Sequence, residues 1–347
     1  MVMVLQSCRR LRCTCPPPDR RRLALLRFGL VGAMLLLAAV AAGAEGNDFA
    51  AWLQGLRTEA QNRGIRATTL DAALIDLKPL PRVIELDRKQ PETTLTYEQY
   101  VKRVLPQSRI HQGQTLLHAH GEVLKQIEAQ YGVPPHVVVA LWGIESDYGH
   151  RTGGFPTIAA LATLAHDGRR GAYFRRELLH ALQIIDEGHI AADQMTGSWA
   201  GAMGQSQFMP SSFLRYAVDF DGDGRRDIWT TLGDVFASTA NYLVQVGWQQ
   251  HEPWGQRVIL PDALDPTSLD LTIQKSLGDW QKLGVRGAAS NSLRTVPARQ
   301  AALVVPSDGP APAFLVFHNF HVFLRWNRST YFALAVSQLS DHIRHGE

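Results

Sequence analysis

Apolar residues recur at helical spacing along most of the chain. From residue 48 to about residue 190 they repeat at positions i, i+3 and i+4, as in the segment 50–56, which is the pattern of helices with one buried face. Pro134 and Pro135 stand where a helix can begin, because proline fits the first helical turn. A second helical pattern runs from Leu232 to Val246. These segments predict a mainly α-helical body.

The pattern changes between His251 and Pro312. Scattered prolines and glycines separate short apolar runs such as 257–260 and 301–305, which predicts a small insertion with some β-structure. The chain then returns through the segment 314–326 and ends in a helix from about residue 330 to residue 343. We expect this last stretch to pack on the helical body, so the predicted fold class is mainly α, of the α+β type.

The first 44 residues differ in composition from the rest. Seven arginines against Asp19 precede an apolar run from Phe28 to Ala44 that ends in small residues, and this order predicts a secretory signal cleaved after Ala44. The alternative is an uncleaved anchor that holds the protein at the inner membrane, because the run approaches the length of about 20 residues that spans a bilayer. Both alternatives place the following residues outside the cytoplasm.

Charge and cysteine usage exclude several classes of function. The full chain carries +3, and the leader alone holds seven arginines and one aspartate, so the remainder carries about −3 and no basic surface for nucleic acid is predicted. Cys8, Cys13 and Cys15 all precede the apolar run, which leaves the exported part without a disulfide or a thiol nucleophile. We therefore expect a soluble exported protein rather than a lipoprotein.

Glu145 is the main candidate for catalysis. Val138, Leu141, Trp142 and Glu145 fall on one face of a predicted helix, so a carboxyl group shares an apolar stripe. Apolar surroundings disfavour the charged form and raise the pKa of a carboxyl, which suits a general acid near neutral pH. The alternative is a buried glutamate that pairs with an arginine for structural reasons.

The segment from Ser198 to Ser212 has the composition of a sugar site. Glycines 201 and 204 allow a ligand to approach the backbone, and Gln205, Gln207, Phe208 and Met209 stand beside them. Amide groups both donate and accept hydrogen bonds, as sugar hydroxyls require, and the aromatic ring offers a stacking surface. The alternative is an ordinary glycine-containing loop between helices.

An aspartate-rich loop comes next, and it predicts calcium. Asp219, Asp221, Asp223, Gly224 and Asp227 match positions 1, 3, 5, 6 and 9 of an EF-hand loop, and the carbonyl of Arg225 takes the backbone-ligand position. Position 12 is Thr230, so the bidentate glutamate is missing and weak affinity is expected unless Asp234 or water substitutes. The alternative is a turn without metal. No organic cofactor is predicted, because neither a phosphate-binding loop nor a metal-ligating histidine pattern is present.

Taken together, these motifs resemble one enzyme family, the B-type membrane-bound lytic transglycosylases of bacterial cell walls, a lysozyme-like group. The resemblance runs from about Gln90 to Ile343. The matching segments are 90–92, 133–135, 143–145 with Gly149, 162–164, 169–170 with 173–174, 201–212, the aspartate loop, 240–242, 325–329 and 333–336.

The resemblance implies a role for each matching residue. Glu145 is the sole catalytic acid and base, with Ser198 and Asn327 near it. The implied substrate-binding residues are Gln207, Phe208, Tyr242 and Trp326 along the glycan groove, and Arg169, Arg170 and Tyr173 at the saccharide or peptide stem. The implied calcium ligands are the side chains of Asp219, Asp221, Asp223 and Asp227 and the carbonyl of Arg225. Trp326 and Phe332 stand where the family commonly has tyrosine, so two hydroxyl hydrogen bonds are in doubt while stacking is retained.

The resemblance also implies a reaction, an architecture and a location. A single acid fits cleavage of peptidoglycan without water, which leaves 1,6-anhydromuramyl ends. The rivals are a lysozyme-type hydrolase that uses Asp147 as a second carboxylate and a non-catalytic calcium- and peptidoglycan-binding module. We expect a periplasmic monomer that acts on glycan strands, with other cell-wall enzymes as further candidate partners.

The expected domains are a signal peptide 1–44, an N-terminal helical domain 45–115, a lysozyme-like core with the calcium loop 116–252, a β-containing insertion 253–311 and a C-terminal return 312–347.

Overall fold

The computed structural model describes most of the chain. It covers residues 48–89, 95–265, 270–288, 293, 296, 298–306 and 312–345. The predicted signal peptide with its three cysteines lies outside the described residues, and so does the 90–92 motif. The chain divides into two compact units, residues 1–56 and 57–347. Of the first unit only residues 48–56 are described, and they are helical. The second unit holds the helices and strands named below.

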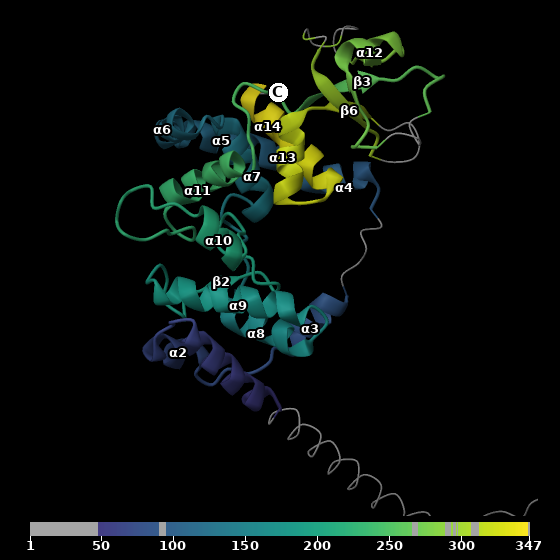
Figure 1. The fold of residues 1–347 in the computed structure, drawn as a ribbon. Coiled ribbons are helices and arrows are strands. Elements are labelled where there is room, and N and C mark those ends of the chain that lie inside the picture. Colours follow the sequence, from purple (N-terminus) through teal and green to yellow (C-terminus); the bar gives the residue numbers. More distant parts are fainter. Residues whose placement is uncertain are drawn as a thin grey trace, which may run out of the picture. The chain divides into compact units, whose positions relative to one another are not determined.

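Helices make up most of the second unit, as the apolar pattern predicted (Figure 1). They are α2 (Ala67–Leu74), α3 (Pro81–Arg88), α4 (Tyr97–Val104), α5 (Gln107–Ala119), α6 (Gly121–Tyr131), α7 (Pro135–Ser146), α8 (Thr157–Asp167), α9 (Gly171–Asp186), α10 (Pro210–Tyr216), α11 (Leu232–Gln245), α12 (Leu277–Lys282), α13 (His318–Trp326) and α14 (Thr330–His345). Among the described residues, no helix combines the length and apolarity needed to cross a bilayer.

Two antiparallel sheets accompany the helices. The strands are β1 (Phe155–Pro156), β2 (Thr196–Gly197), β3 (Gly255–Ile259), β4 (Gln274–Ser276), β5 (Arg286–Gly287), β6 (Gln300–Val304) and β7 (Ala313–Val316). β1 pairs with β2, and the others form one sheet in the order β4-β6-β7-β3-β5. The prediction of a mainly α fold with a small β-containing insertion is confirmed.

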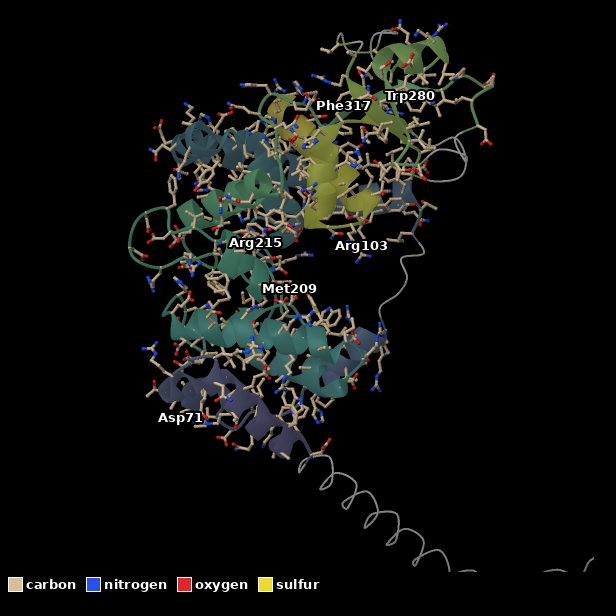
Figure 2. The ribbon with its side chains drawn as sticks, in the orientation of Figure 1. Asp71, Arg103, Met209, Arg215, Trp280 and Phe317 are labelled. Atoms are coloured by element: carbon tan, nitrogen blue, oxygen red, sulfur yellow. The ribbon has the colours of Figure 1, made fainter. Side chains whose placement is uncertain are left out.

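The central strands of the larger sheet are buried on both faces. Ala302 and Phe314 pack into the helical core, whereas Leu303 and Leu315 pack into a second, smaller core around Trp280. Successive side chains of a strand point to opposite faces, so β6 and β7 separate the two cores. Figure 2 shows Trp280 beside the sheet, where its indole N–H donates to the Ala301 carbonyl at 2.9 Å.

Two of the predicted domain boundaries fall inside structural units. α5 continues without a break across residue 115, because its helical hydrogen bonds are not interrupted there. β7 lies beyond residue 311 and pairs with both β3 and β6, so the insertion keeps a strand that the sequence assigned to the C-terminal return. The remaining boundaries stay predictions.

α7 is the helix around which the core is built. It contacts α5, α6, α11 and α14 (Figure 1), and all its residues from Val137 to Gly143 are buried. The predicted single apolar face is thus too narrow, because the helix is covered on all sides. A Cβ at Gly143 would lie 2.7 Å from the Tyr148 ring, so only glycine fits this close approach.

The end of α7 is set by an unusual turn. Asp147, Tyr148 and Gly149 have φ values of 53°, 59° and 85°, a left-handed conformation that glycine, asparagine and aspartate tolerate but that is unfavourable for a bulky residue such as Tyr148. The Tyr148 hydroxyl donates to the carbonyl of Arg109 at 2.8 Å, and Arg109 in turn binds Asp147. These contacts with α5 hold the turn, which places the last turn of α7 and the Glu145 that it carries.

Candidate active site

Glu145 lies in the last turn of α7, where its carboxyl meets a tryptophan from α13. The indole N–H of Trp326 donates to Oε1 of Glu145 at 2.6 Å. Burial raises the pKa of Glu145 to about 7, against a smaller lowering by the Trp326 hydrogen bond. The residue is partly exposed, so the carboxyl is desolvated while its side chain can still be reached. The acid is therefore largely protonated just below neutral pH, as the sequence predicted.

Three predicted substrate-binding residues form one aromatic cluster beside the acid. The ring of Trp326 lies 4.5 Å from that of Tyr242 and 5.4 Å from that of Phe208, and the last two rings are 5.7 Å apart. The Tyr242 hydroxyl donates to the carbonyl of Arg325 at 2.8 Å, which ties α11 to α13. Three segments far apart in sequence thus meet at the carboxyl of Glu145.

The glutamine-containing loop is held by its own amides. The Nε2 of Gln207 donates to the carbonyls of Thr152 at 3.0 Å and Gly204 at 2.8 Å. Gln205, which the sequence placed among the amides of a sugar site, accepts the indole N–H of Trp142 at 2.8 Å. Because Trp142 lies three residues before Glu145 on α7, this amide braces the loop against the helix that carries Glu145.

Two residues expected near Glu145 make local contacts in this structure. The Oγ of Ser198 accepts the N–H of Ala202 at 3.0 Å. The side-chain oxygen of Asn327, directly after α13, accepts the N–H of Ser329 at 3.0 Å. Both bonds shape loops, and the expected roles of Ser198 and Asn327 in orienting the carboxyl or the sugar stay predictions.

The predicted arginine pair is bound to a buried aspartate that sequence reasoning did not single out. Arg170 donates to Oδ1 of Asp87 at 2.5 Å, and Arg169 donates to the Asp87 carbonyl at 3.4 Å. The guanidinium of Arg170 also lies over the Phe174 ring, whereas Tyr173 is exposed. The arginines tie α3 to the start of α9, and contact of this region with saccharide or stem peptide stays a prediction.

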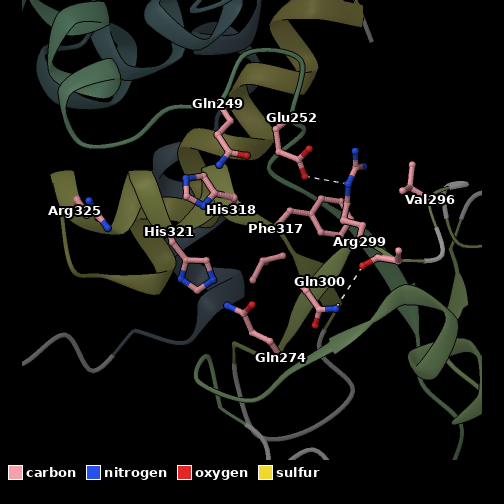
Figure 3. A pocket seen from close by; sticks show the side chains of 12 residues that line it. Gln249, Glu252, Gln274, Val296, Arg299, Gln300, Phe317, His318, His321 and Arg325 are labelled. Atoms are coloured by element: carbon pink, nitrogen blue, oxygen red, sulfur yellow. Dashed lines mark hydrogen bonds and ion pairs between the residues drawn. The ribbon is translucent and has the colours of Figure 1, made fainter.

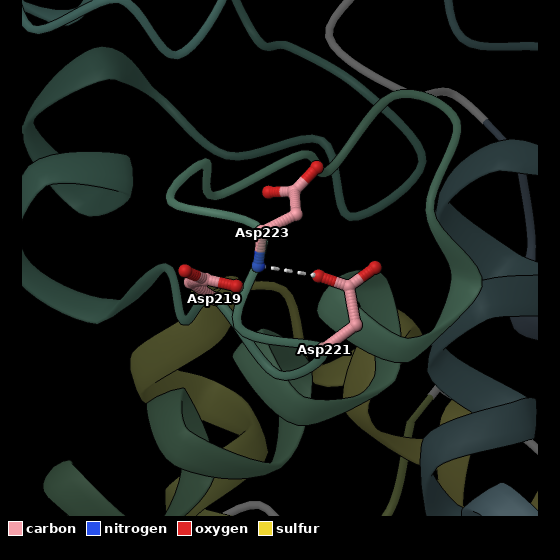
Figure 4. A group of neighbouring side chains, drawn as sticks. All are labelled: Asp219, Asp221 and Asp223. Atoms are coloured by element: carbon pink, nitrogen blue, oxygen red, sulfur yellow. Dashed lines mark hydrogen bonds between the residues drawn. The ribbon is translucent and has the colours of Figure 1, made fainter.

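The aspartate loop brings together three of the four predicted carboxylate ligands. Oxygens of Asp219, Asp221 and Asp223 lie within 4.8 Å of one another (Figure 4), a spacing that suits coordination of one hard cation. Gly224 has φ 89° at the sharp turn, as an EF-hand loop requires. These residues fit calcium.

Asp227 does not join that cluster. Its carboxylate accepts the N–H of Trp229 at 2.8 Å and the N–H of Thr230 at 2.9 Å, together with both threonine hydroxyls at 230 and 231. Nearby donors thus occupy its oxygens in this conformation, and the role of Asp227 as a calcium ligand stays a prediction. Asp234 accepts the backbone N–H groups of Phe220 and Asp227, so it braces the loop.

Known proteins share both the sequence and the fold of this chain. The model of the transglycosylase SLT domain family matches residues 48–341. This chain belongs to that family. Membrane-bound lytic murein transglycosylase B of Escherichia coli (strain K12) is 30% identical over 303 residues, which are 81% of this chain and 79% of the relative. The resemblance stated from the motifs is thus confirmed.

Solved structures of the family have the same architecture. SltB3 from Pseudomonas aeruginosa, in complex with NAG-NAM-pentapeptide, is 45% identical with a TM-score of 0.83, and the match covers 86% of this chain and 80% of that one. The Escherichia coli lytic transglycosylase Slt35, in complex with calcium, is 28% identical with a TM-score of 0.72, covering 84% and 92%. The lysozyme-like architecture is confirmed.

Asp147, the second carboxylate of the hydrolase alternative, forms ion pairs with arginines in this transglycosylase. Arg109 donates to it at 2.8 Å, and Arg151 lies 3.4 Å away. Both guanidinium groups compensate the charge of this carboxylate, and Arg109 engages it with α5. This arrangement disfavours the hydrolase alternative, in which Asp147 activates water.

We expect Asp147→Asn to retain cell-wall lysis within the same order of magnitude as the wild type. Asparagine tolerates the left-handed conformation, but loss of the ion pair with Arg109 should lower the free energy of unfolding by about 1–3 kcal/mol. Lysis rates and denaturant unfolding check both parts. A loss of lysis as large as that of a Glu145 variant, in a folded protein, would restore Asp147 as a catalytic group.

Proposed function

We propose that the chain is a peptidoglycan lytic transglycosylase whose single catalytic acid and base is Glu145. The observation that carries this proposal is the hydrogen bond between Trp326 and Glu145, which places an acid with a pKa of about 7 against an aromatic cluster. Such an acid can both donate and accept a proton near neutral pH. The activity of the relatives supports the same reaction, because they are named lytic transglycosylases.

The first half of the reaction is protonation. Glu145 donates its proton to the oxygen that joins N-acetylmuramic acid to N-acetylglucosamine, and the bond from that oxygen to the muramyl C1 breaks. The N-acetylglucosamine leaves with a free hydroxyl. The acetamido group of the substrate stabilises the positive C1, a task that a second carboxylate performs in other glycosidases.

The second half regenerates the acid. The Glu145 carboxylate takes the proton of the muramyl C6 hydroxyl while that oxygen bonds to C1. The proton count balances, no water is consumed and a 1,6-anhydromuramyl end forms. An indole can donate a hydrogen bond but cannot accept one, so Trp326 binds Oε1 in both protonation states. We therefore assign the proton transfers to Oε2.

The mass of the released fragments tests this proposal. Protein spanning residues 45–347 is incubated with purified peptidoglycan, and anhydromuramyl fragments, one water lighter than hydrolysis products, are expected. Reducing-end fragments would instead identify a hydrolase. The same measurement on a Glu145 variant is considered in the Discussion.

Calcium is proposed as a structural ligand of the loop 219–227. The three clustered carboxylates support this role, and so does the calcium complex of Slt35. The loop follows the segment 201–212 and precedes α11, which carries Tyr242, so the metal stiffens one wall of the site without taking part in the chemistry.

We expect calcium to raise the thermal midpoint by about 4 °C at about a hundred times its Kd, because it binds the folded state preferentially. Asp221→Asn should remove the shift, whereas Asp262→Asn, at an exposed aspartate outside the loop, should keep it. Differential scanning calorimetry with calcium and with chelator measures the effect. An unchanged midpoint in the wild type would contradict a structural role.

The proposed setting is the periplasm. The predicted signal peptide supports export, and the Escherichia coli relative is named as a membrane-bound enzyme that acts on murein. Glycan strands are the proposed partner, since SltB3 was solved with peptidoglycan fragments. A monomeric state and contacts with other cell-wall enzymes stay predictions.

A further inference from the structure

A cavity of about 710 Å³ lies beside α13, apart from the Glu145 carboxyl. Its walls come from α13, from β4 and β6 of the sheet, and from the segment after α11 (Figure 3). The volume lies within the range of small-ligand sites, about 300–1,000 Å³. The described polar residues that line it are Gln249, Glu252, Gln274, Arg299, Gln300, His318, His321 and Arg325.

The α13 wall carries the positive charge of Arg325 beside two histidines. His318, His321 and Arg325 are spaced i, i+3 and i+7, so they share one helical face. The Nε2 of His318 lies 2.7 Å from the carbonyl of Gly247, and Arg325 donates to the carbonyl of Val246 at 2.9 Å. Because both partners are neutral, the positive charge of Arg325 is not cancelled by them. The Nε2 of His321 is buried and has no hydrogen-bond partner among the described residues.

The opposite wall is neutral and rich in amides. Arg299 pairs with Glu252 at 3.0 Å, which cancels both charges. Gln274 from β4 and Gln300 from β6 add side-chain amides that both donate and accept hydrogen bonds. The guanidinium of Arg299 lies over the Phe317 ring, 5.2 Å from its centroid. That ring face is covered, so it offers no stacking surface for a sugar ring.

One residue of the cavity wall adjoins, in sequence, the tryptophan that binds Glu145. Arg325 lines it, and the next residue, Trp326, holds Glu145. The Tyr242 hydroxyl fixes the Arg325 carbonyl at 2.8 Å, so the aromatic cluster and the cavity share this corner of α13. At about 1.5 Å per residue, the wall from Arg325 to His318 extends about 10 Å away from Trp326.

We propose that this cavity binds the carboxylate-bearing peptide stem of the muramyl residue held at Glu145. Arg325 pairs with a stem carboxylate, and His321 with the amides of Gln274 and Gln300 hydrogen-bonds the peptide groups. Arg325 is bound only to a neutral carbonyl, the side-chain amides can bond peptide groups, and the aromatic ring is covered. These features suit an acidic peptide better than a second sugar. This subsite rests on the proposed function, because it takes the stem of that substrate.

The test compares glycan strands that carry stems with strands whose stems have been removed. Arg325→Gln and Gln274→Ala, from opposite walls, should each lower kcat/KM on the stem-bearing strands about tenfold, mainly through KM. Both should leave kcat/KM on bare strands unchanged. Arg286→Gln, an exposed arginine outside the cavity, is the charge-matched control and should change neither value.

A binding measurement makes the test independent of turnover. Glu145→Gln protein is titrated calorimetrically with a synthetic stem peptide that ends in a free carboxylate, and with its amidated form. Tighter binding of the carboxylate form, lost on adding Arg325→Gln, supports the subsite. Equal losses on both strand types, no loss on either, or equal binding of both peptides would overturn it. If the wild type cuts neither strand type, the proposed function itself fails.

Discussion

Replacing Glu145 by glutamine is expected to lower turnover of peptidoglycan by about 10³- to 10⁴-fold, because in the proposed mechanism this one residue supplies both proton transfers. The amide keeps the size of the carboxyl and can still accept the Trp326 indole hydrogen bond seen at 2.6 Å. Binding of glycan should therefore survive. Release of anhydromuramyl fragments and the Kd for a non-cleaved glycan measure the two effects separately.

The same substitution should stabilise the fold at alkaline pH. The pKa of Glu145 rises from 4.5 to about 7 in the folded state, so folded protein holds this proton more tightly than unfolded protein does. The unfolding free energy of the wild type is thus highest below about pH 4.5 and falls as the pH rises through 7. Glutamine cannot ionise, so the variant should gain up to about 3 kcal/mol over the wild type at pH 8 and nothing at pH 4.

Glu122→Gln is the matched control, since Glu122 is exposed on α6. It should change neither turnover nor the pH dependence of unfolding. Strong residual lysis by Glu145→Gln would remove Glu145 from the mechanism. A gain in stability that is the same at pH 4 and pH 8 would contradict the burial of an ionisable carboxyl.

Trp326→Phe is expected to move the alkaline limb of the kcat/KM profile upwards by about one to two pH units. The indole N–H stabilises the charged carboxylate and so lowers the pKa of Glu145. Hydrogen bonds to charged groups contribute about 1.5–3 kcal/mol, which corresponds to about one to two units of pKa. Without the donor the pKa rises, the acid stays protonated to higher pH and activity persists there.

Turnover at pH 6 should nevertheless fall about tenfold in Trp326→Phe, because the carboxyl loses its orienting bond. Phenylalanine keeps an aromatic ring against Tyr242 and Phe208, so the effect isolates the N–H. Trp326→Tyr supplies a hydroxyl donor and should return the alkaline limb of the profile close to that of the wild type. A limb that stays in place in Trp326→Phe would show that Trp326 does not tune the acid.

Local pattern was sufficient to predict the helices and two of the chemical features. Glu145 could be found because it shares an apolar helical face with Leu141 and Trp142, and the aspartate loop because its carboxylates recur within nine consecutive residues. Both signals depend on neighbours in the chain. The larger sheet was predicted only as short β-structure, since its order β4-β6-β7-β3-β5 depends on pairing between distant strands.

The amino-acid sequence by itself determined the fold class, the acid and the acidic loop, because helix periodicity and loop chemistry are set by nearby residues. Only the tertiary structure decided what each of these touches. The indole of Trp326 donates to Glu145, 181 positions away in the chain. Asp147 forms an ion pair with Arg109 from α5, and Arg170 pairs with Asp87 of α3. The pKa of the acid depends on such contacts, since desolvation and hydrogen bonding arise when separate helices pack together.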